Sequence, residues 1–444
     1  MSQQPTRKKA LILGAGVTGI SCTRYLLAQG FDVTVADSRN HPPGTAELEA
    51  LLPTNHLEFG VSLDQVSLTG VDSLVVSPGL PRTLGLLDRA RALGIEAVCD
   101  VEIFLRQAKA PVIAVTGTNG KSTLVMMIAH LLRAAGVNAL AGGNLGPAAL
   151  DLLAEPTPDY YLLELSSFQL EWLQEPAPAV AVITNITPDH LDRYDSFADY
   201  RAAKARVLGG AQRVVLNLDD RESRKLAMTL PVSTPVDWFG ASASEPDATL
   251  IDLKDIPSVN GLMGEHNRIN AQAALTVVSG LGLTAQLPAN YWNGFEGLPH
   301  RLQLVATING VRWLNDSKAT NVGATLAAAE GLAADEKSRL VLVLGGEGKG
   351  QDFAPLRQLV PRLRAVVVTG HDGSRIAKLL TEWVPVKRAV DMNQVVDMAA
   401  ALAQPGDTVL FSPACASQDQ YRDYQHRGDC FVAAVKALAP KVDE

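Results

Sequence analysis

The stretch that decides the fold class spans residues 111–123 and reads PVIAVTGTNGKST. It joins a short run of apolar and β-branched residues to a glycine-rich turn, after which a helical stretch begins. A continuous apolar run bounded by glycine is typical of a strand buried on both faces of a parallel sheet. Because parallel strands need a crossover connection, usually a helix, this stretch predicts one strand–turn–helix unit of an α/β fold.

The same order of run, turn and helical stretch recurs along the chain. The other runs are ALILG, DVTVAD, SLVVS, YYLLE, AVAVIT, RLVLVLGG, AVVVTG and TVLF. They fall into three groups. One boundary lies near residue 99, ahead of the strand that opens at Pro111, and the other near residue 298, where Gly and Pro punctuate the pattern. We therefore predict an α/β protein of three domains, at residues 1–99, 100–298 and 299–444, each with a mainly parallel sheet. The outer two would be Rossmann-like and the central one P-loop ATPase-like. Ligands bind such sheets at the carboxyl ends of the strands, so the loops there are candidate sites.

Length and composition restrict the class of protein. The 444 residues fit two to four domains at roughly 100–200 residues per domain. With 47% hydrophobic and 19% charged residues, the composition is globular, and a net charge of −8 argues against a nucleic-acid partner. No apolar run approaches the roughly 20 residues of a spanning helix, so we predict no membrane segment, and the N-terminus does not read as a signal peptide. The cysteines lack metal-ligand spacing and fit free thiols.

A glycine-rich turn near the N-terminus predicts a first phosphate site. It reads GAGVTG at residues 14–19 and follows an apolar run, while Asp37 ends the next run. Glycines let the backbone approach a diphosphate, and the start of the following helix offers amide donors. The motif indicates a nucleotide diphosphate without specifying which one. An NAD enzyme fits it, although the domain is short for a complete dinucleotide site; a tight turn without a ligand is the alternative.

The turn at residues 116–123 predicts a second phosphate site. It ends in Gly-Lys-Ser like a Walker A loop, but Val115 stands where that motif has its first glycine. The loop amides would hold phosphates, Lys121 would reach the terminal phosphates, and Ser122 would offer its hydroxyl to Mg²⁺. A simple dehydrogenase does not need this second site and a simple kinase does not need the first. One site would therefore hold a substrate and the other ATP.

Further polar side chains follow the P-loop at the ends of predicted strands. Glu164 ends the run YYLLE, and Asp189 and His190 follow Asn-Ile-Thr-Pro. Such groups beside a P-loop suit Mg²⁺, which takes few protein ligands. Taken alone, His190 would be a structural histidine, but its position at a strand end next to Asn-Ile-Thr-Pro favours a metal ligand. Lys204 lies in the helical stretch FADYRAAKA, where periodicity alone predicts a solvated surface lysine.

A last group of polar residues lies in the loops of the third predicted domain. It comprises PHR at 299–301, NDSKATN at 315–321, GGEGK at 345–349 and SPACAS at 412–417. Lysines, an arginine and hydroxyls at strand ends predict an anionic substrate such as an amino-acid dicarboxylate. A chance collection of polar loop residues is the alternative.

Taken together, these segments resemble the Mur ligase family. GTNGKST is shared with the wider superfamily, which includes the folylpolyglutamate synthases. The narrower matches are ELSSFQLE, ITNITPDHLDRY, YRAAKARV, GEHNRINA, GLPHR, NDSKATN, LGGEGKG and SPACASQDQ. NDSKATN and SPACAS-x-DQ are most similar to the D-glutamate-adding member. The resemblance extends from the first residues to near residue 428.

The resemblance implies that the first domain binds UDP rather than NAD, since one mononucleotide half then suffices. The substrates would be UDP-N-acetylmuramoyl-L-alanine and D-glutamate, joined during bacterial peptidoglycan precursor synthesis by a cytoplasmic monomer. The residues implied for uridine diphosphate are Gly16, Val17, Thr18, Asp37, Ser38, Arg39, Ser77 and Gly79. Those implied for the diphosphate and sugar are Asn144, Ser166 and Gln169.

The resemblance also implies residues for ATP, two Mg²⁺ ions and D-glutamate. The ATP residues are Gly117, Thr118, Asn119, Gly120, Lys121, Ser122, Thr123, Asn270, Arg301 and Asp316. The D-glutamate residues are Lys318, Thr320, Lys349, Ser417 and Tyr424, the last being phenylalanine in many relatives. The catalytic residues would be Lys121, Glu164, His190 and Lys204. Ser122 and Glu164 would bind one Mg²⁺, and His190 the other, supported by a carbamoylated Lys204.

The implied reaction transfers the γ-phosphoryl group of ATP to the alanine carboxylate, and the amine of D-glutamate then displaces phosphate. Other functions stay open at this point. A sibling Mur ligase would add a different amino acid, and a folylpolyglutamate synthase-like ligase would not need the turn at 14–19. A non-catalytic nucleotide-binding regulator would be expected to lose some of the catalytic residues. An NAD oxidoreductase would leave the P-loop unexplained.

Overall fold

The computed structural model of this chain describes residues 7–144, 146–190, 193–241, 250–256, 265–295, 297, 299–332 and 339–438. The chain divides into two compact units. One is Met1–Pro188, Ser196–Leu250 and Ala273–Ala289, and the other is Asp189–Asp195, Ile251–Gln272 and Asn290–Glu444. We describe each unit by itself. The predicted boundary at residue 298 falls on Leu298, outside the described residues, and the division into three domains stays a prediction.

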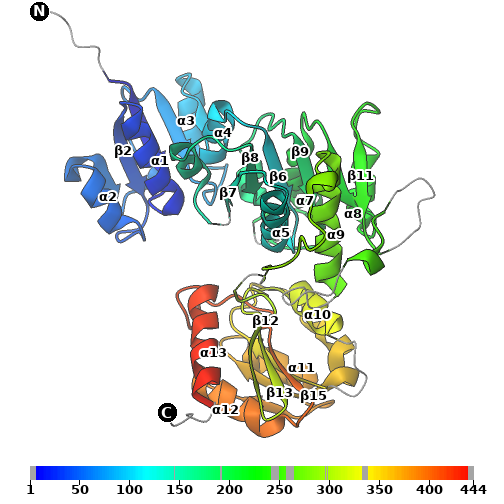
Figure 1. The fold of residues 1–444 in the computed structure, drawn as a ribbon. Coiled ribbons are helices and arrows are strands. Elements are labelled where there is room, and N and C mark those ends of the chain that lie inside the picture. Colours follow the sequence, from blue (N-terminus) through cyan, green and yellow to red (C-terminus); the bar gives the residue numbers. More distant parts are fainter. Residues whose placement is uncertain are drawn as a thin grey trace, which may run out of the picture. The chain divides into compact units, whose positions relative to one another are not determined.

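Three sheets confirm the predicted α/β class, and among the described strands only one pair runs antiparallel (Figure 1). The first sheet, in the order β3-β2-β1-β4-β5, has five parallel strands. They are β1 (Lys9–Leu13), β2 (Asp32–Asp37), β3 (Leu57–Phe59), β4 (Ser73–Val76) and β5 (Ala97–Val98). The connecting helices are α1 (Val17–Ala28), α2 (Thr45–Leu51), α3 (Gly85–Ala92), α4 (Asp100–Gln107), η1 (Thr54–His56) and η2 (Leu63–Gln65). The strand order reverses at β1, so a crevice is expected beyond its carboxyl end.

The second sheet also lies in the first unit. Its six parallel strands have the order β11-β10-β9-β6-β8-β7. They are β6 (Val112–Thr116), β7 (Ala139–Gly143), β8 (Tyr160–Glu164), β9 (Val180–Ile183), β10 (Val214–Asn217) and β11 (Val236–Phe239). The helices of this unit are α5 (Lys121–Ala134), α6 (Ser167–Leu170), α7 (Phe197–Ala205), α8 (Arg221–Ala227), η3 (Ala149–Ala154), η4 (Arg206–Leu208) and η6 (Thr284–Gln286). Helix α9 (Glu265–Gly280) is divided between the units after Gln272, and η5 (Leu253–Asp255) belongs to the second unit. Every residue of β6 is buried, as expected for the run VIAVT between two neighbouring strands.

The third sheet lies in the second unit and has six strands in the order β12-β13-β17-β14-β15-β16. They are β12 (Gln303–Ile308), β13 (Val311–Asn315), β14 (Leu340–Gly345), β15 (Leu363–Thr369), β16 (Val386–Arg388) and β17 (Thr408–Phe411). The helices are α10 (Val322–Gly331), α11 (Gly373–Leu380), α12 (Met392–Leu402), α13 (Tyr424–Leu438) and η7 (Ala354–Arg362). Along β14, Leu342 and Leu344 join one apolar cluster, whereas Val341 and Val343 join another. The two faces of the sheet therefore bury separate cores, each covered by helices.

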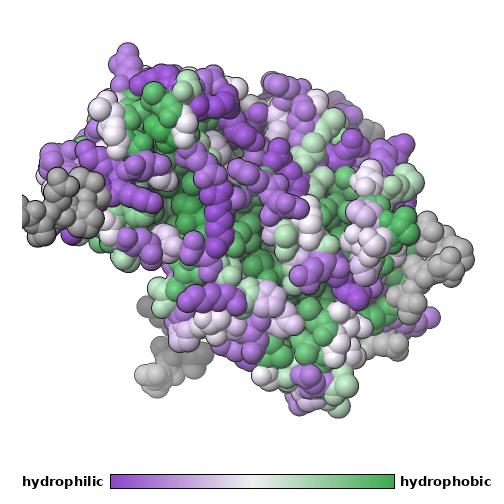
Figure 2. Space-filling model, turned by 90° about the horizontal axis from the view of Figure 1, so that it is seen from above, coloured by the Kyte–Doolittle hydropathy of each residue, from purple (hydrophilic) through white to green (hydrophobic). Residues whose placement is uncertain are grey.

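The surface mixes residue types, as is usual for a globular protein. Hydrophilic and hydrophobic residues are interspersed over the face seen in Figure 2. Single apolar side chains such as Val17, Met228 and Trp383 are exposed. Within the described ranges, no helix combines the length and apolar character needed to cross a bilayer.

Candidate active site

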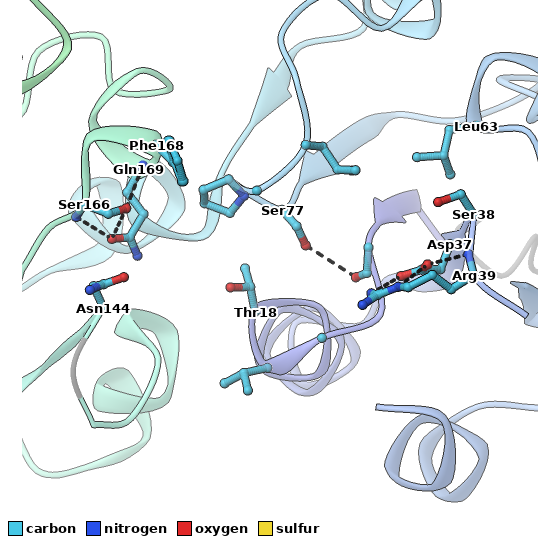
Figure 3. A pocket seen from close by; sticks show the side chains of 16 residues that line it. Thr18, Asp37, Ser38, Arg39, Leu63, Ser77, Asn144, Ser166, Phe168 and Gln169 are labelled. Atoms are coloured by element: carbon cyan, nitrogen blue, oxygen red, sulfur yellow. Dashed lines mark hydrogen bonds and ion pairs between the residues drawn. The ribbon is translucent and has the colours of Figure 1, made fainter. Parts of the chain in front are cut away.

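A cavity of about 440 Å³ opens at the carboxyl ends of β1, β2 and β4. All residues predicted for the UDP moiety line this cavity, together with Gly14, Leu63, Pro78, Leu80 and Phe168. Figure 3 shows Asn144, Ser166, Phe168 and Gln169 on one side of it and Asp37, Ser38, Arg39 and Leu63 on the other. The walls of the cavity thus come from loops of both the first and the second sheet.

The turn at residues 14–19 requires glycine because it passes very close to the Ser77 side chain and to its own backbone. Gly14 has a φ of +100°, and a Cβ there would lie 2.5 Å from Ser77 Oγ. A Cβ on Gly19 would lie 2.0 Å from the carbonyl oxygen of Gly14. The N-cap of α1 is Gly16, which has no side chain to cap the first amides of the helix. Those donors therefore remain suited to an anion such as a diphosphate.

Asp37 fastens this turn to the end of β2. Its carboxylate accepts hydrogen bonds from the backbone N of Ala15 (2.8 Å), the backbone N of Arg39 (2.8 Å) and the Arg39 guanidinium (2.7 and 2.9 Å). Burial alone would raise the pKa of Asp37, but these donors outweigh it and lower the pKa to about 2. Asp37 is therefore ionised at neutral pH, and the charge orders both the turn and the Arg39 side chain beside the cavity.

The P-loop lies between β6 and α5 and is held by side chains from the end of β9. Thr184 Oγ1 donates to the carbonyl of Asn119 at 2.6 Å, and the backbone N of Asn119 donates to Asn185 Oδ1 at 2.9 Å. Lys121 Nζ donates to the carbonyls of Gly117 and Thr118 at 3.0 and 2.9 Å. The lysine ammonium is thus folded over the loop, where the terminal phosphates of a nucleotide would lie.

Gly117 is the P-loop position least able to accept a side chain, and Gly117→Ala is expected to destabilise the fold. Its φ is +145°, and a Cβ would lie 1.8 Å from Thr184 Oγ1. We expect the free energy of unfolding to fall by about 2–4 kcal/mol, measured by urea denaturation. Gly94→Ala is the matched control, because Gly94 has a φ of +73° and open space around the added Cβ. It should cost about 1 kcal/mol; equal losses in the two variants would contradict the steric argument.

Lys204 is buried, so its interpretation from periodicity as a surface lysine is wrong. Its side chain is 2% exposed, Nζ donates to the carbonyl of Gly117 at 2.7 Å, and Nζ lies 4.8 Å from the centroid of the Tyr200 ring. Tyr200 in turn places its hydroxyl 2.9 Å from Thr118 Oγ1. Tyr200, Ala203 and Lys204 form the buried face of α7 at the i, i+3, i+4 spacing. The helix therefore presents the lysine to the P-loop.

Glu164 lies beside the P-loop at the end of the neighbouring strand. It pairs in register with Val115 of β6 and is 2% exposed. Its Oε1 accepts a hydrogen bond from Asn144 Nδ2 at 2.7 Å, and Asn144 also lines the cavity described above. Ser122, the second residue of α5, is 3% exposed. One side chain thus connects the cavity with the carboxylate predicted to bind a metal.

The donor set next to the P-loop fits Mg²⁺ in its chemistry. Among the described residues, no three His, Cys, Asp or Glu side chains gather in a metal-binding arrangement. Ser122 and Glu164 nevertheless offer a hydroxyl and a carboxylate, the hard oxygen ligands of an ion that takes its other ligands from phosphates and water. These two residues would hold Mg²⁺ together with a bound nucleotide.

The remaining metal and ATP residues predicted from sequence belong to the second unit. His190 has a φ of +53° and a side chain that is 40% exposed, and Leu191 and Asp192 of the same motif lie outside the described residues. Its neighbour Asp189 accepts a hydrogen bond from Asn321 Nδ2 at 3.4 Å. The P-loop, Glu164 and Lys204 belong to the first unit, so a metal shared by His190 and Lys204 stays a prediction.

The second unit also contains the predicted ATP residues Asn270, Arg301 and Asp316. The carboxyl group of Asp316 has a strongly raised pKa. Burial raises the pKa of Asp316 to about 7, against the hydrogen bond that Ser412 Oγ donates at 2.7 Å and the nearby charge of Arg301. The backbone N of Leu302 donates to its other oxygen at 3.3 Å. A protonated Asp316 is therefore favoured in the folded protein over most of the acidic range.

The raised pKa of Asp316 predicts a pH-dependent effect of Asp316→Asn. The folded chain keeps this proton up to about pH 7, whereas an unfolded carboxyl releases it near 3.8, so its contribution to stability falls as pH rises between these values. At pH 8 the free energy of unfolding of the variant should exceed that of the wild type by about 4 kcal/mol, and at pH 4 the two should nearly agree. Thermal unfolding at both pH values measures this. Asp397→Asn, on the exposed face of α12, is the control and should change neither value; a pH-independent difference for Asp316→Asn would contradict the assignment.

The residues predicted for D-glutamate come from loops at one edge of the third sheet. These loops follow β13, β17 and β14, which are neighbours and parallel. Lys318 Nζ lies 4.0 Å from the centroid of the Tyr424 ring. Lys349 is exposed and has a φ of +48°, whereas Ser417 is only 2% exposed. The loops that carry them meet at an isolated antiparallel bridge between Glu347 and Ala416. Thr320 follows in the Lys318 loop and is partly buried.

A buried arginine in this region was missed by the sequence analysis. Arg427 is 2% exposed and donates to Ser317 Oγ and O (3.0 and 2.7 Å) and to the carbonyls of Cys415 and Ala416 (3.0 and 3.1 Å). Burial lowers its pKa to about 10, which still leaves it charged. It joins the NDSK and SPACAS loops. The available signal was its position three residues after Tyr424 on the same helix.

Family models match three consecutive parts of the chain. They are described as "Mur ligase MurD-like, N-terminal domain" at residues 8–99, "Mur ligase middle domain" at 115–278 and "Mur ligase, glutamate ligase domain" at 300–415. Among solved structures, UDP-N-acetylmuramate-alanine ligase of Thermotoga maritima has the same fold, with a TM-score of 0.59 at 20% identity, covering 97% of this chain and 99% of its own.

Curated relatives match over nearly the whole length. The UDP-N-acetylmuramoylalanine–D-glutamate ligase of Nitrosococcus oceani is 42% identical, covering 97% of this chain and 96% of the relative. The protein of the same name from Marinobacter nauticus is 40% identical, covering 99% and 100%. Together with the family models and the arrangement of the P-loop, Glu164 and the N-terminal cavity, these matches establish that the chain belongs to the Mur ligase family.

Proposed function

We propose that this chain is an ATP-dependent ligase that joins D-glutamate to UDP-N-acetylmuramoyl-L-alanine in peptidoglycan precursor synthesis. Relatives of that name at 40–42% identity over nearly full length support the proposal. The structural observation that carries it is the position of Asn144. This residue lines the cavity suited to a nucleotide diphosphate and donates to Glu164 beside the P-loop. A substrate anchored by UDP in the cavity would therefore extend towards bound ATP.

The proposed reaction proceeds through an acyl phosphate. An oxygen of the alanine carboxylate forms a bond to the γ-phosphorus of ATP, and the bond to the leaving ADP oxygen breaks. The amine of D-glutamate then attacks the acyl carbon, and phosphate leaves as the amide forms and the amine loses its proton. Because two anions must approach each other, the protein acts mainly through positioning and positive charge.

The residues have separate proposed roles in this reaction. Lys121 would stabilise charge on the transferring phosphoryl group from its place over the P-loop. Ser122 and Glu164 would bind one Mg²⁺, which would neutralise phosphate charge. His190 would bind a second, with Lys204 carbamoylated by reaction of its neutral amine with CO₂ and release of a proton. The carbamate nitrogen keeps one N–H, so the hydrogen bond to Gly117 could persist.

The loops of the third sheet would bind the incoming amino acid. Lys318, Lys349 and the hydroxyls of Thr320 and Ser417 offer the donors that a dicarboxylate requires, and the Tyr424 ring lies against Lys318. Asn270, Arg301 and Asp316 would complete the ATP site. We further propose that the enzyme acts as a monomer in the bacterial cytoplasm, and sedimentation at micromolar concentration tests the monomer.

Phosphate release from ATP and Mg²⁺ tests the proposal. The assay contains UDP-N-acetylmuramoyl-L-alanine and, in separate reactions, D-glutamate, L-glutamate, L-alanine or a diamino acid. We expect release that depends on D-glutamate alone. Release with another of these amino acids would move the chain to a sibling activity, and no release despite intact ATP binding would favour a regulator.

A further inference from the structure

A contact outside the proposed chemistry ties two walls of the cavity together. One wall is the loop at residues 77–80 after β4, and the other is the segment at 166–169 after β8. Arg82 lies just beyond the first wall, and Glu171 and Trp172 lie just beyond the second. Arg82 Nη1 donates to the carbonyl of Glu171 at 2.5 Å, and the guanidinium carbon lies 5.2 Å from the centroid of the Trp172 ring. The contact thus spans the first and second sheets.

The Trp172 ring that Arg82 contacts is buried and fixed in position. Its side chain is 7% exposed, and its backbone N donates to the carbonyl of the cavity residue Gln169 at 3.1 Å. Within the described part of the chain, its buried indole Nε1 has no hydrogen-bond partner. Packing and the Arg82 guanidinium, rather than a hydrogen bond, therefore hold the indole ring. Tryptophan is the aromatic side chain that binds a cation over its face most strongly.

A second tie joins the two sheets through a different cavity element. Ser21 Oγ donates to Asp151 Oδ1 at 2.8 Å, and Arg24 Nη1 lies 3.9 Å from the same oxygen. Ser21 and Arg24 belong to α1, whose first turn lines the cavity, and Asp151 belongs to η3. Arg82 provides the corresponding tie between the loop after β4 and the segment after β8.

We propose that Arg82 is a positioning residue that holds the loop at 77–80 against the segment at 166–169 and so maintains the width of the substrate cavity. The proposal rests on the proposed function, which assigns this cavity to the UDP-linked substrate. Arg82 does not line the cavity, so it acts through residues such as Ser77 and Gln169. Without the Arg82 contact, the two walls would be less ordered before binding, and the free-energy cost of ordering them would weaken the binding of the UDP moiety. The affinity for the UDP moiety should fall while the chemical step is unchanged.

Arg82→Met tests this role, because methionine keeps an apolar stem and removes the guanidinium. Calorimetric titration with UDP, which probes the cavity without ATP or D-glutamate, should show a Kd raised about threefold to tenfold. The KM for UDP-N-acetylmuramoyl-L-alanine should rise by a similar factor, with unchanged kcat and unchanged KM values for ATP and D-glutamate. The ligand-free variant should also show altered tryptophan emission, since the cation leaves the Trp172 ring.

Arg91→Met is the matched control. Arg91 lines the same neighbouring cavity of about 210 Å³ as Arg82 and Trp172, but its side chain is 76% exposed and pairs with Asp88. We expect wild-type UDP affinity for this variant. In a double-mutant cycle, Trp172→Leu should weaken UDP binding less than Arg82→Met, because the hydrogen bond to the Glu171 carbonyl remains, and the double variant should bind no more weakly than Arg82→Met.

The outcomes separate the two proposals. A wild-type protein that does not bind UDP would overturn the proposed function and the role of Arg82 with it. A wild type that binds UDP and an Arg82→Met variant that binds it equally well would overturn the role of Arg82 alone. Additive losses in the double variant, or an equal loss in Arg91→Met, would also contradict it.

Discussion

Lys204→Ala is expected to lower kcat by about a hundredfold or more, and acetate or propionate added to the assay should restore part of the loss. The variant removes a side chain that is 2% exposed and contacts both Gly117 and the Tyr200 ring beside the P-loop. If the lysine is carbamoylated, the missing group is a carboxylate, which a small acid can replace in the cavity left by alanine. If it acts as an ammonium, a carboxylic acid cannot substitute for it.

Two further measurements separate these possibilities. Lys204→Arg keeps a cation but cannot form the carbamate, because the guanidinium stays protonated. We therefore expect this variant to be inactive, and added acids should not restore its activity. Removal of CO₂ and bicarbonate from the wild type should lower its activity, and bicarbonate should restore it. Lys225→Ala is the control, since Lys225 forms a partly exposed ion pair with Glu222 on α8. Full activity of untreated Lys204→Ala would exclude the proposed role.

The strands that position the site could be predicted because most of their side chains are buried. The runs before the P-loop and before Glu164 are buried almost throughout, whereas the run before Asp37 alternates at first, with Asp32 and Thr34 only partly buried. Each run ends at a polar residue that starts a loop. Such runs have few alternative structures in a chain of this composition. The carboxyl ends of parallel strands share one edge of a sheet, so the approximate location of the sites followed as well.

β7 could not be predicted in this way. Its sequence ALAGG contains glycines, which disfavour strands on propensity alone. In the structure the second of these glycines, Gly143, is required, because a Cβ there would lie 2.4 Å from the carbonyl oxygen of Glu164. This close approach brings Asn144 within hydrogen-bonding distance of the Glu164 carboxylate. The link between the two parts of the site therefore depends on strand pairing over 20 residues, which a local pattern does not report.

The burial of Lys204 and Arg427 was hidden for a related reason. Both lie on helices whose composition suits a solvated face, and each is covered by loops from distant parts of the chain. Lys204 contacts Gly117, and Arg427 contacts Ser317 and Cys415. A long polar side chain buried by tertiary contacts looks the same in sequence as one in solvent, so only family resemblance drew attention to Lys204.

Lys121→Met is expected to reduce kcat by about a thousandfold or more, with little change in UDP binding. Lys121 Nζ already contacts two carbonyls of the P-loop, so its charge is in place before the nucleotide binds and needs little reorganisation. That charge matters most when the γ-phosphoryl group is between the two oxygens, because the negative charge there is then spread over atoms close to the lysine. Removing it should therefore affect the transition state more than the bound ground state.

Single-turnover phosphate release measures the chemical step, and titration with a non-hydrolysable ATP analogue measures ground-state binding. We expect the rate of phosphate release to fall by far more than the affinity for the analogue, and the Kd for UDP in its separate cavity to stay within about twofold. Lys109→Met is the control, since Lys109 is exposed in the loop before β6. An equal loss of rate and analogue affinity would assign Lys121 to nucleotide binding alone. We expect Lys121→Arg to be slow as well, because a planar guanidinium cannot occupy the ammonium's position between the carbonyls of Gly117 and Thr118. A normal rate in Lys121→Arg would show that positive charge is sufficient without the lysine geometry.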